Sequence, residues 1–191
     1  MSRPYTGLVS TFNLRTARLR PGEAWRGEVP IELEPLELGG QCYAPVPAEQ
    51  LGTLAITRLT SGLLFELAFD VELAGPCMRC LEDAAVALAI RAREYQAIGA
   101  EASEETTTPY LVDDRFDLSA WARDAIALEL PEKILCREEC AGLCPGCGAN
   151  LNVETCSCPP AELDPRLSKL AELRDRLSSE EPYASGRRPE A

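Results

Sequence analysis

The sequence contains no histidine, and this absence excludes several kinds of chemistry. Without an imidazole, the chain offers neither a Ser-His-Asp arrangement nor a histidine general base. Metal sites that mix thiolate and imidazole ligands are excluded for the same reason. Any zinc bound here must therefore be held by cysteine thiolates, with a carboxylate as the only other candidate donor.

The sequence also lacks a long apolar run and a signal-peptide pattern at its start. Arg3, Arg15, Arg18 and Arg20 interrupt the first residues. No window approaches the roughly 18 consecutive apolar residues that a membrane helix needs. We therefore expect a cytoplasmic protein without a membrane partner. Thiols stay reduced in that compartment, so the nine cysteines are expected to bind metal rather than form disulfides.

Positive charge is scarce: the chain has 19 basic and 31 acidic side chains, and its formal net charge is −12. Proteins that bind nucleic acid draw much of their affinity from Lys and Arg that neutralise phosphates. Strong nonspecific binding to RNA or DNA is therefore not expected, and a basic protein partner fits better. Arg79, Arg91 and Arg93 are candidates for a local RNA-contacting patch, although the surrounding acids favour a solvated or ion-paired face.

Alternating apolar and polar residues predict a mainly β structure in the first half of the chain. Residues 65–73 and 86–95 form the clearest pattern, typical of a long antiparallel hairpin with Cys77 and Cys80 at its tip. Shorter strands are expected at residues 9–14, 29–34, 41–46 and 54–59. Pro30 places the second of these at a sheet edge, because proline cannot donate a ladder hydrogen bond.

One helix is expected after a solvated acidic loop at residues 99–109. Asp117 suits its N-cap and Pro131 its end, with an apolar stripe of Leu118, Trp121, Ala122, Ala125 and Leu128. These elements predict an α+β fold: an antiparallel sheet or open barrel with one or two helices and a C-terminal cysteine-rich zinc knuckle. We expect an α+β body at 1–135, the knuckle segment at 136–160, and a C-terminal helix with a disordered tail at 161–191.

Eight of the nine cysteines form four close pairs, and Cys42 is left over. Cys-Pro-x-Cys-Gly, beginning at Cys144, is the turn known as a zinc knuckle, in which two thiolates converge while backbone N–H groups face the sulfurs. Two zinc ions are expected, each held by four thiolates, although a single ion held by some of the C-terminal thiols remains open. The predicted ligands are Cys77, Cys80, Cys136 and Cys140 at one site, and Cys144, Cys147, Cys156 and Cys158 at the other.

A structural role for the zinc is favoured over a catalytic one, because all-thiolate sites are closed whereas catalytic zinc keeps an open position for water. A redox role for Cys77 and Cys80 lacks the surrounding βαβ pattern that thioredoxin-like proteins have. Cys42, which lies in an expected strand, is interpreted as an ordinary buried thiol.

Two motifs together resemble the YceD family of bacterial and plastid proteins. One is Cys-x-Arg-Cys-Leu-Glu at 77–82, and the other is Cys-x3-Cys-x-Gly-Leu-Cys-Pro-x-Cys-Gly-x-Asn-Leu-Asn at 136–152, closing with Cys156-Ser157-Cys158. The order of two further motifs along the chain also matches that family: Leu-Glu-Leu-Gly-Gly at 36–40 and Asp-Leu-x-x-x-x-Arg at 117–123. The resemblance implies a role in accumulation of large-subunit ribosomal RNA, with no established enzyme activity and no catalytic residue to carry over.

Three hypotheses for function follow. The first is a non-enzymatic, zinc-stabilised factor for ribosome biogenesis, whose partner is a basic ribosomal protein or assembly factor rather than a small-molecule substrate. The second is a zinc-dependent RNA-processing hydrolase, which closed thiolate sites disfavour. The third is a zinc-storage or thiol-redox protein. Direct contact with rRNA stays open.

Overall fold

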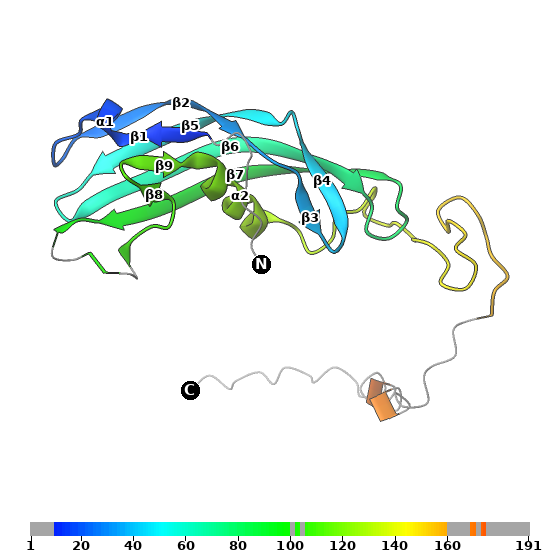
Figure 1. The fold of residues 1–191 in the computed structure, drawn as a ribbon. Helices are drawn as coiled ribbons and strands as arrows, with labels where there is room; N and C mark the ends of the chain where they lie inside the picture. The colour runs from blue at the N-terminus through cyan, green and yellow to red at the C-terminus, as the bar shows by residue number, and fades with distance from the viewer. Residues whose placement is uncertain (1–9, 100–101, 104–105, 160–168, 171–172, 175–191) are drawn as a thin grey trace, which may run out of the picture. The chain divides into compact units, whose positions relative to one another are not determined.

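The structure is a computed structural model that describes residues 10–99, 102–103, 106–159, 169–170 and 173–174. The chain divides into two compact units, Met1–Gly142 and Leu143–Ala191. We call the first the body and the second the C-terminal unit, and each is described by itself (Figure 1). The expected C-terminal helix and tail at 161–191 lie outside the described residues, apart from 169–170 and 173–174, which are helical.

The body is built mainly from antiparallel strands, as the alternating sequence predicts. No helix among the described residues has the length and apolar character needed to cross a bilayer. The elements are β1 (Thr11–Asn13), α1 (Leu14–Ala17), β2 (Ala24–Glu32), β3 (Leu36–Leu38), β4 (Gln41–Val46), β5 (Glu49–Arg58), β6 (Gly62–Pro76), β7 (Asp83–Ala97), β8 (Leu111–Val112), β9 (Arg115–Asp117) and α2 (Leu118–Glu129).

The central strand of the main sheet is β6, and it pairs with β7 along its whole length. The other side of β6 pairs with β5 near its start and with β4 near its end. Beyond these lie β2, next to β5, and β3, next to β4 (Figure 1). The long hairpin is therefore confirmed, and β2, which carries Pro30, lies at the end of the strand order as predicted.

The core lies between one face of this sheet and the elements around α2. Alternate residues of β6, from Leu63 through Phe65 to Leu73, are buried. A second, three-stranded sheet in the order β1-β9-β8 leads into α2, whose N-cap Asp117 accepts a hydrogen bond from the Ala120 N–H at 2.9 Å. Phe116 stacks on Phe65 with ring centroids 4.2 Å apart, so it joins the two sheets. The helix packs against β7, β2 and β1.

Two details of the predicted burial are wrong. Leu128 is 87% exposed, and Ile126 takes the buried position instead. At 3.6 residues per turn, Leu128 lies at the margin of the apolar stripe, where the last turn of α2 leaves the core. Cys42 is exposed, because its neighbour Tyr43 occupies the inward position of β4 and donates its hydroxyl to the Pro76 carbonyl at 2.7 Å.

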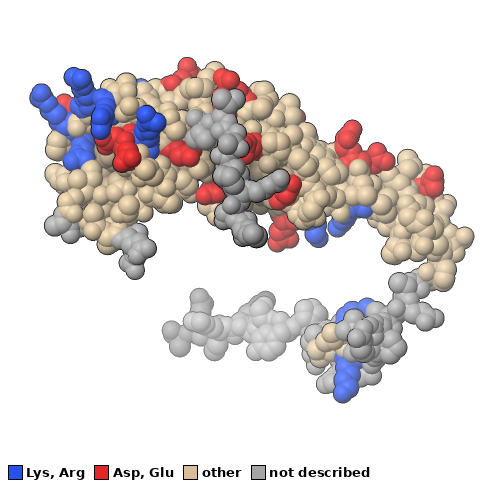
Figure 2. Space-filling view, in the orientation of Figure 1, with Lys and Arg blue, Asp and Glu red and all other residues tan. Residues whose placement is uncertain are grey.

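Charge is unevenly distributed over the body. Figure 2 shows acidic side chains scattered across the visible face, whereas Lys and Arg gather at the end where α1 lies. The tip of the β6–β7 hairpin, residues 77–82, is formed where Pro76 pairs with Asp83. The β6–β7 register fixes this turn in space.

Candidate metal centres

Four cysteine sulfurs meet at the tip of the β6–β7 hairpin. Cys77 and Cys80 belong to the turn itself, whereas Cys136 and Cys140 come from the segment after α2. All four Sγ atoms lie within 4.8 Å of one another. The Sγ atoms of Cys77 and Cys140 are 3.8 Å apart, and those of Cys80 and Cys136 are 3.5 Å apart. We call these four residues the hairpin cluster.

Contacts other than sulfur also hold the segment after α2 against the hairpin tip. The Met78 N–H donates to the carbonyl of Ile134 at 2.9 Å, and the Ile134 N–H donates to the Met78 sulfur at 3.4 Å. Ile134 is 1% exposed. The Arg79 guanidinium donates through Nη1 to the Cys140 carbonyl at 2.7 Å. The hairpin cluster is therefore set in a packed, hydrogen-bonded frame.

The other four predicted ligands meet within the C-terminal unit. The Sγ atoms of Cys144, Cys147, Cys156 and Cys158 lie within 4.8 Å of one another, and those of Cys144 and Cys156 are 3.4 Å apart. We call these four residues the C-terminal cluster. Cys144 is buried, Cys147 is exposed, and the remaining two are at least partly exposed. The Asn150 side chain accepts the Asn152 N–H at 3.0 Å and shapes the turn between the two pairs.

The two Cys-x-x-Cys turns have the same backbone pattern. The Cys77 N–H donates to the Glu82 carbonyl, and the Leu81 N–H donates back to the Cys77 carbonyl. In the second turn the Cys144 N–H donates to Ala149, and the Gly148 N–H donates to Cys144. The residue after the second cysteine is left-handed in both, with φ of 64° at Leu81 and 75° at Gly148. Both turns thus present the N–H groups between their cysteines to the sulfurs, as a zinc knuckle does.

The first thiol of each turn is unusually acidic. Burial raises the pKa of Cys77, but backbone N–H groups, that of Arg79 foremost, outweigh burial and lower this pKa to about 6. The N–H groups of Cys147 and Gly146 lower the pKa of Cys144 to about 6 as well. Burial and neighbouring thiols raise the pKa of Cys136 to about 12, and neighbouring thiols and burial do the same for Cys158. A dication at the centre of either cluster would relieve the mutual repulsion of its thiolates.

The sulfur geometry fits a tetrahedral zinc ion. Zn–S bonds of about 2.3 Å place the sulfurs of such a site about 3.8 Å apart. The three Sγ–Sγ distances given above, 3.8, 3.5 and 3.4 Å, lie near this value, and every pair within a cluster lies within 4.8 Å. The structure therefore groups the eight cysteines into the two sets of four that their spacing predicts. Each set could hold one metal ion, and ligation by these named residues stays a prediction.

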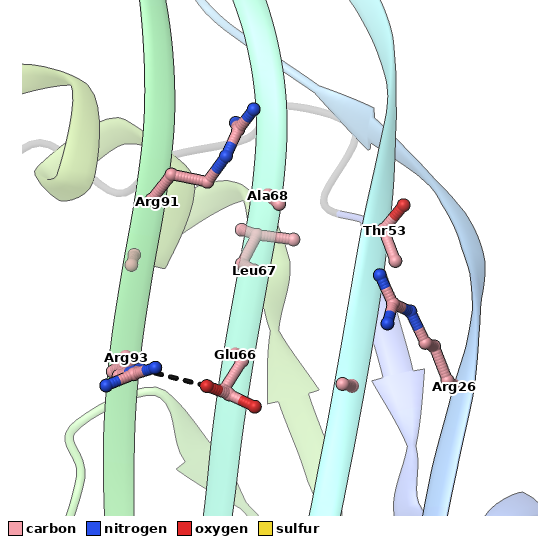
Figure 3. Close-up of a pocket in the computed structure, with 9 residues that line it drawn as sticks. Arg26, Thr53, Glu66, Leu67, Ala68, Arg91 and Arg93 are labelled. Atoms are coloured by element: carbon pink, nitrogen blue, oxygen red, sulfur yellow. Dashed lines mark hydrogen bonds and ion pairs between the residues drawn. The ribbon is translucent and has the colours of Figure 1, made fainter.

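The three arginines considered for RNA contact have local partners. Arg79 is bound to the Cys140 carbonyl, as described above. Figure 3 shows the groove beside Arg91 and Arg93, where Arg93 forms an ion pair with Glu66 at 2.9 Å. Arg91 lies 3.5 Å from Asp70. The ion-paired interpretation of Arg91 and Arg93 is therefore correct for this face of the sheet.

Sequence reasoning missed the residues that support the hairpin cluster without belonging to it. Met78, Arg79 and Ile134 bind the two segments together through hydrogen bonds to backbone or sulfur atoms. Ile134 carried a signal that could have been used, because Ile134 and Leu135 form a short apolar pair directly before Cys136. No local pattern indicates that Leu81 is left-handed, except its match in position to Gly148.

Comparison with known proteins places these features in a wider context. An uncharacterized protein of Mycobacterium tuberculosis is 33% identical over 124 residues, which are 63% of this chain and 59% of that protein. A second relative is named large ribosomal RNA subunit accumulation protein YCED homolog 1, chloroplastic, of Arabidopsis thaliana. It is 37% identical over 65 residues, 34% of this chain and 20% of its own length. A homolog of the same name from Zea mays is 45% identical over 49 residues, 25% of this chain and 17% of its own.

The chain thus spans about 59% of the length of the mycobacterial relative. No solved structure matches the chain. The family model described as "Large ribosomal RNA subunit accumulation protein YceD" matches residues 65–174, more than half of the 191 residues. That range contains nearly all of the β6–β7 hairpin, together with α2 and both cysteine clusters. The chain belongs to the YceD family.

Proposed function

We propose that this protein is a non-enzymatic, zinc-stabilised factor for the accumulation of large-subunit ribosomal RNA, and hence for ribosome biogenesis. The observation that carries the proposal is the YceD match, whose range includes all eight clustered cysteines. The matched range thus includes the hairpin tip and the segment after α2, from which the two clusters are built. The proposed place of action is any compartment in which ribosomes are assembled.

Each cluster is proposed to hold one zinc ion as a structural ligand set, two ions in all. Four thiolates complete a tetrahedral shell and leave no position for a reactive water, which disfavours a hydrolase. Zinc bound in this way supplies charge neutralisation and cross-linking rather than chemistry. The hairpin cluster would fix the segment after α2 to the sheet, and the C-terminal cluster would order its own loop.

Elemental analysis of protein grown with zinc tests the metal part of the proposal. Two zinc ions per chain are expected, and one after replacement of a ligand in either cluster. Cys42→Ser is the matched control, because Cys42 is exposed and lies outside both clusters. One metal or fewer in the unaltered protein would contradict the two-site assignment. Ready loss of both ions to a weak chelator would favour zinc storage.

The proposed partner is a basic ribosomal protein or assembly factor. The net charge of −12, made more negative by zinc-bound thiolates, attracts cationic surfaces and steers their association. The complex should weaken as salt rises, because exposed charges are screened beyond a Debye length of about 8 Å at physiological ionic strength. Recovery of large-subunit proteins with the tagged chain after ribonuclease treatment is the expected result.

Depletion of the protein in its own cells tests the function. Large-subunit rRNA should fall relative to small-subunit rRNA, and wild-type protein or Cys42→Ser should restore the ratio. Cys77→Ser should fail to restore it, because the hairpin tip loses its zinc. An unchanged rRNA ratio after depletion would overturn the proposed function. Cleavage of precursor rRNA by the purified protein would favour the hydrolase instead.

A further inference from the structure

The basic end of the body is formed by arginines from separate segments around one cleft. Arg15 lies in α1, Arg18 closes that helix in a left-handed conformation with φ of 43°, and Arg58 ends β5. These three line a cleft of about 370 Å³. Figure 2 shows a group of Lys and Arg side chains at this end, with acidic side chains among them and a smaller basic group beneath the opposite end of the body.

Two further arginines flank the cleft. The turn that follows Arg20 is held against the end of β5, because the Gly22 N–H donates to the Arg58 carbonyl at 2.7 Å and the Arg58 N–H donates to Glu23 at 2.9 Å. Arg115 of β9 pairs in register with Asn13, the N-cap of α1. We call this set the arginine end: Arg15, Arg18, Arg20, Arg58 and Arg115.

Most of this positive charge is not neutralised within the described residues. Only Arg15 has an ion pair there, with Asp114 at 3.0 Å. Asp114 is the acid that lines the cleft, and the Glu23 carboxylate accepts the backbone N–H of Arg20. The groove of Figure 3 differs, since both of its β7 arginines face a carboxylate. Within the described part of so acidic a chain, this surplus of arginine over carboxylate indicates a site for an anionic ligand.

The cleft between these arginines has apolar walls. Leu14, Leu19, Ile98 and Leu111 line it together with the guanidinium-bearing residues. A single-stranded nucleic acid would match both the arginines and the apolar walls of the cleft. Guanidinium groups pair with phosphate oxygens, and apolar side chains cover the faces of bases. We propose that the arginine end binds the phosphodiester backbone of single-stranded RNA, with a base against the leucine-lined wall.

This proposal deepens the proposed function and rests on it for the choice of RNA over other polyanions. It also assigns different partners to two surfaces. The acidic regions would bind a basic protein, and the arginine end would bind the RNA that such a protein accompanies. An acidic polypeptide is the competing occupant, because carboxylates also pair with arginine. RNA is the favoured occupant because its bases would cover the apolar wall, to which a run of carboxylates offers no counterpart.

Fluorescence anisotropy with labelled oligouridine tests the site on the intact, zinc-loaded protein. Arg18→Gln combined with Arg58→Gln should weaken binding at least about tenfold at low salt. The same double variant should lower the slope of log Kd against log salt by about 1.4, or about 0.7 for each phosphate that is no longer neutralised. Arg91→Gln combined with Arg93→Gln removes the same charge from the ion-paired groove and should change Kd less than about twofold. Circular dichroism and zinc content should match between the two double variants.

Equal losses in the two double variants would overturn the proposal, because net charge alone would then explain binding. Tighter competition by polyglutamate than by unlabelled oligouridine would assign the site to an acidic polypeptide. Failure of oligouridine to bind, with rRNA still lost on depletion, would sink the RNA site and leave the proposed function standing. An unchanged rRNA ratio on depletion, with intact binding of oligouridine, would overturn the proposed function and leave the RNA site standing.

Discussion

The two cysteine clusters have the same turn but very different surroundings. In the hairpin cluster, three of the four cysteines are buried, and its members are separated by as many as 63 residues in sequence. In the C-terminal cluster all four cysteines lie within residues 144–158, and Cys147 is exposed. The first joins parts of one folded unit that are distant in sequence, and the second closes a short loop.

This difference concerns what each metal ion would stabilise. The hairpin cluster has support of its own, because Ile134 is buried against the tip and Arg79 binds the Cys140 carbonyl. The C-terminal cluster has a few turn hydrogen bonds and little buried apolar surface among its described residues. A metal ion in the first would add to an existing core, whereas a metal ion in the second would replace a core.

The largest effect should come from Cys77→Ser. Loss of a fully buried ligand should leave the remaining thiolates repelling one another at the end of the main sheet. We expect the body to lose on the order of 5 kcal/mol, because structural zinc contributes about 10–16 kcal/mol of apparent binding energy in isolated fingers. The midpoint of thermal unfolding, followed by tryptophan fluorescence, should shift down by about 10–20 °C. Trp121 suits this measurement because it is 3% exposed.

Cys42→Ser is the control for Cys77→Ser. It makes the same chemical change at an exposed position outside both clusters and should alter the free energy of unfolding by less than about 0.5 kcal/mol. Equal stability of Cys77→Ser and Cys42→Ser would mean that the hairpin cluster holds no structural metal.

Ile134→Ala tests the apolar packing around the hairpin cluster, which does not depend on a metal ion. Removing this side chain, which is 1% exposed, should cost about 2–4 kcal/mol through lost burial and the cavity that remains. The zinc content should stay unchanged, because Met78 and Ile134 meet through backbone and sulfur atoms. Val153→Ala is the matched change beside the C-terminal cluster; Val153 is 77% exposed, and its loss should cost almost nothing. A similar cost at the two positions would remove the distinction between the clusters.

Cys156→Ser should have a local effect only. We expect loss of one zinc ion and faster hydrogen exchange in residues 143–158, because only a few turn hydrogen bonds otherwise hold this loop among its described residues. The unfolding temperature of the body should change by less than about 2 °C, which corresponds to roughly 0.5 kcal/mol. A fall as large as that caused by Cys77→Ser would show that the two clusters do not act separately.

The sequence predicts the main features of this structure where a pattern is long or chemically specific. The β6–β7 hairpin follows from fifteen-residue strands of alternating character, and the Asp117 cap from its own side-chain chemistry. The grouping of cysteines into two fours follows from their close spacing, which leaves few ways to bring four sulfurs together. These features are local or strongly periodic, so tertiary contacts do not override them.

What the sequence does not predict depends on competition between neighbours. Cys42 and Tyr43 both suit the inside of β4, and the tyrosine takes it because its hydroxyl finds the Pro76 carbonyl. Leu128 and Ile126 are both plausible on the buried stripe of α2, and only the path of the sheet decides between them. The short strands β3, β8 and β9 carry too few residues to show a period, and pairing alone defines them.

The smallest effect should come from exchanging the left-handed residues of the two turns. Leu81 has φ of 64° and is 57% exposed, so it bears backbone strain and gains little from burial. A non-glycine residue in this conformation costs about 1–2 kcal/mol. After allowance for the greater freedom of glycine in the unfolded chain, Leu81→Gly should stabilise the body by up to about 1 kcal/mol. Chemical denaturation should show a higher midpoint with an unchanged slope.

Gly148→Ala is the opposite exchange in the C-terminal cluster. A Cβ at Gly148 meets no atom within 4 Å, so any effect must come from the backbone at φ of 75° and not from a clash. A cost of about 1.4 kcal/mol would lower the zinc affinity of this cluster about tenfold. Competition with a chromogenic chelator should detect that change, while the affinity of the hairpin cluster stays the same. The contrary result would be that Leu81→Gly destabilises the body while Gly148→Ala leaves the zinc affinity unchanged. That result would mean that the shared left-handed backbone of the two turns does not contribute to stability or zinc affinity, and that the cysteine sulfurs alone do.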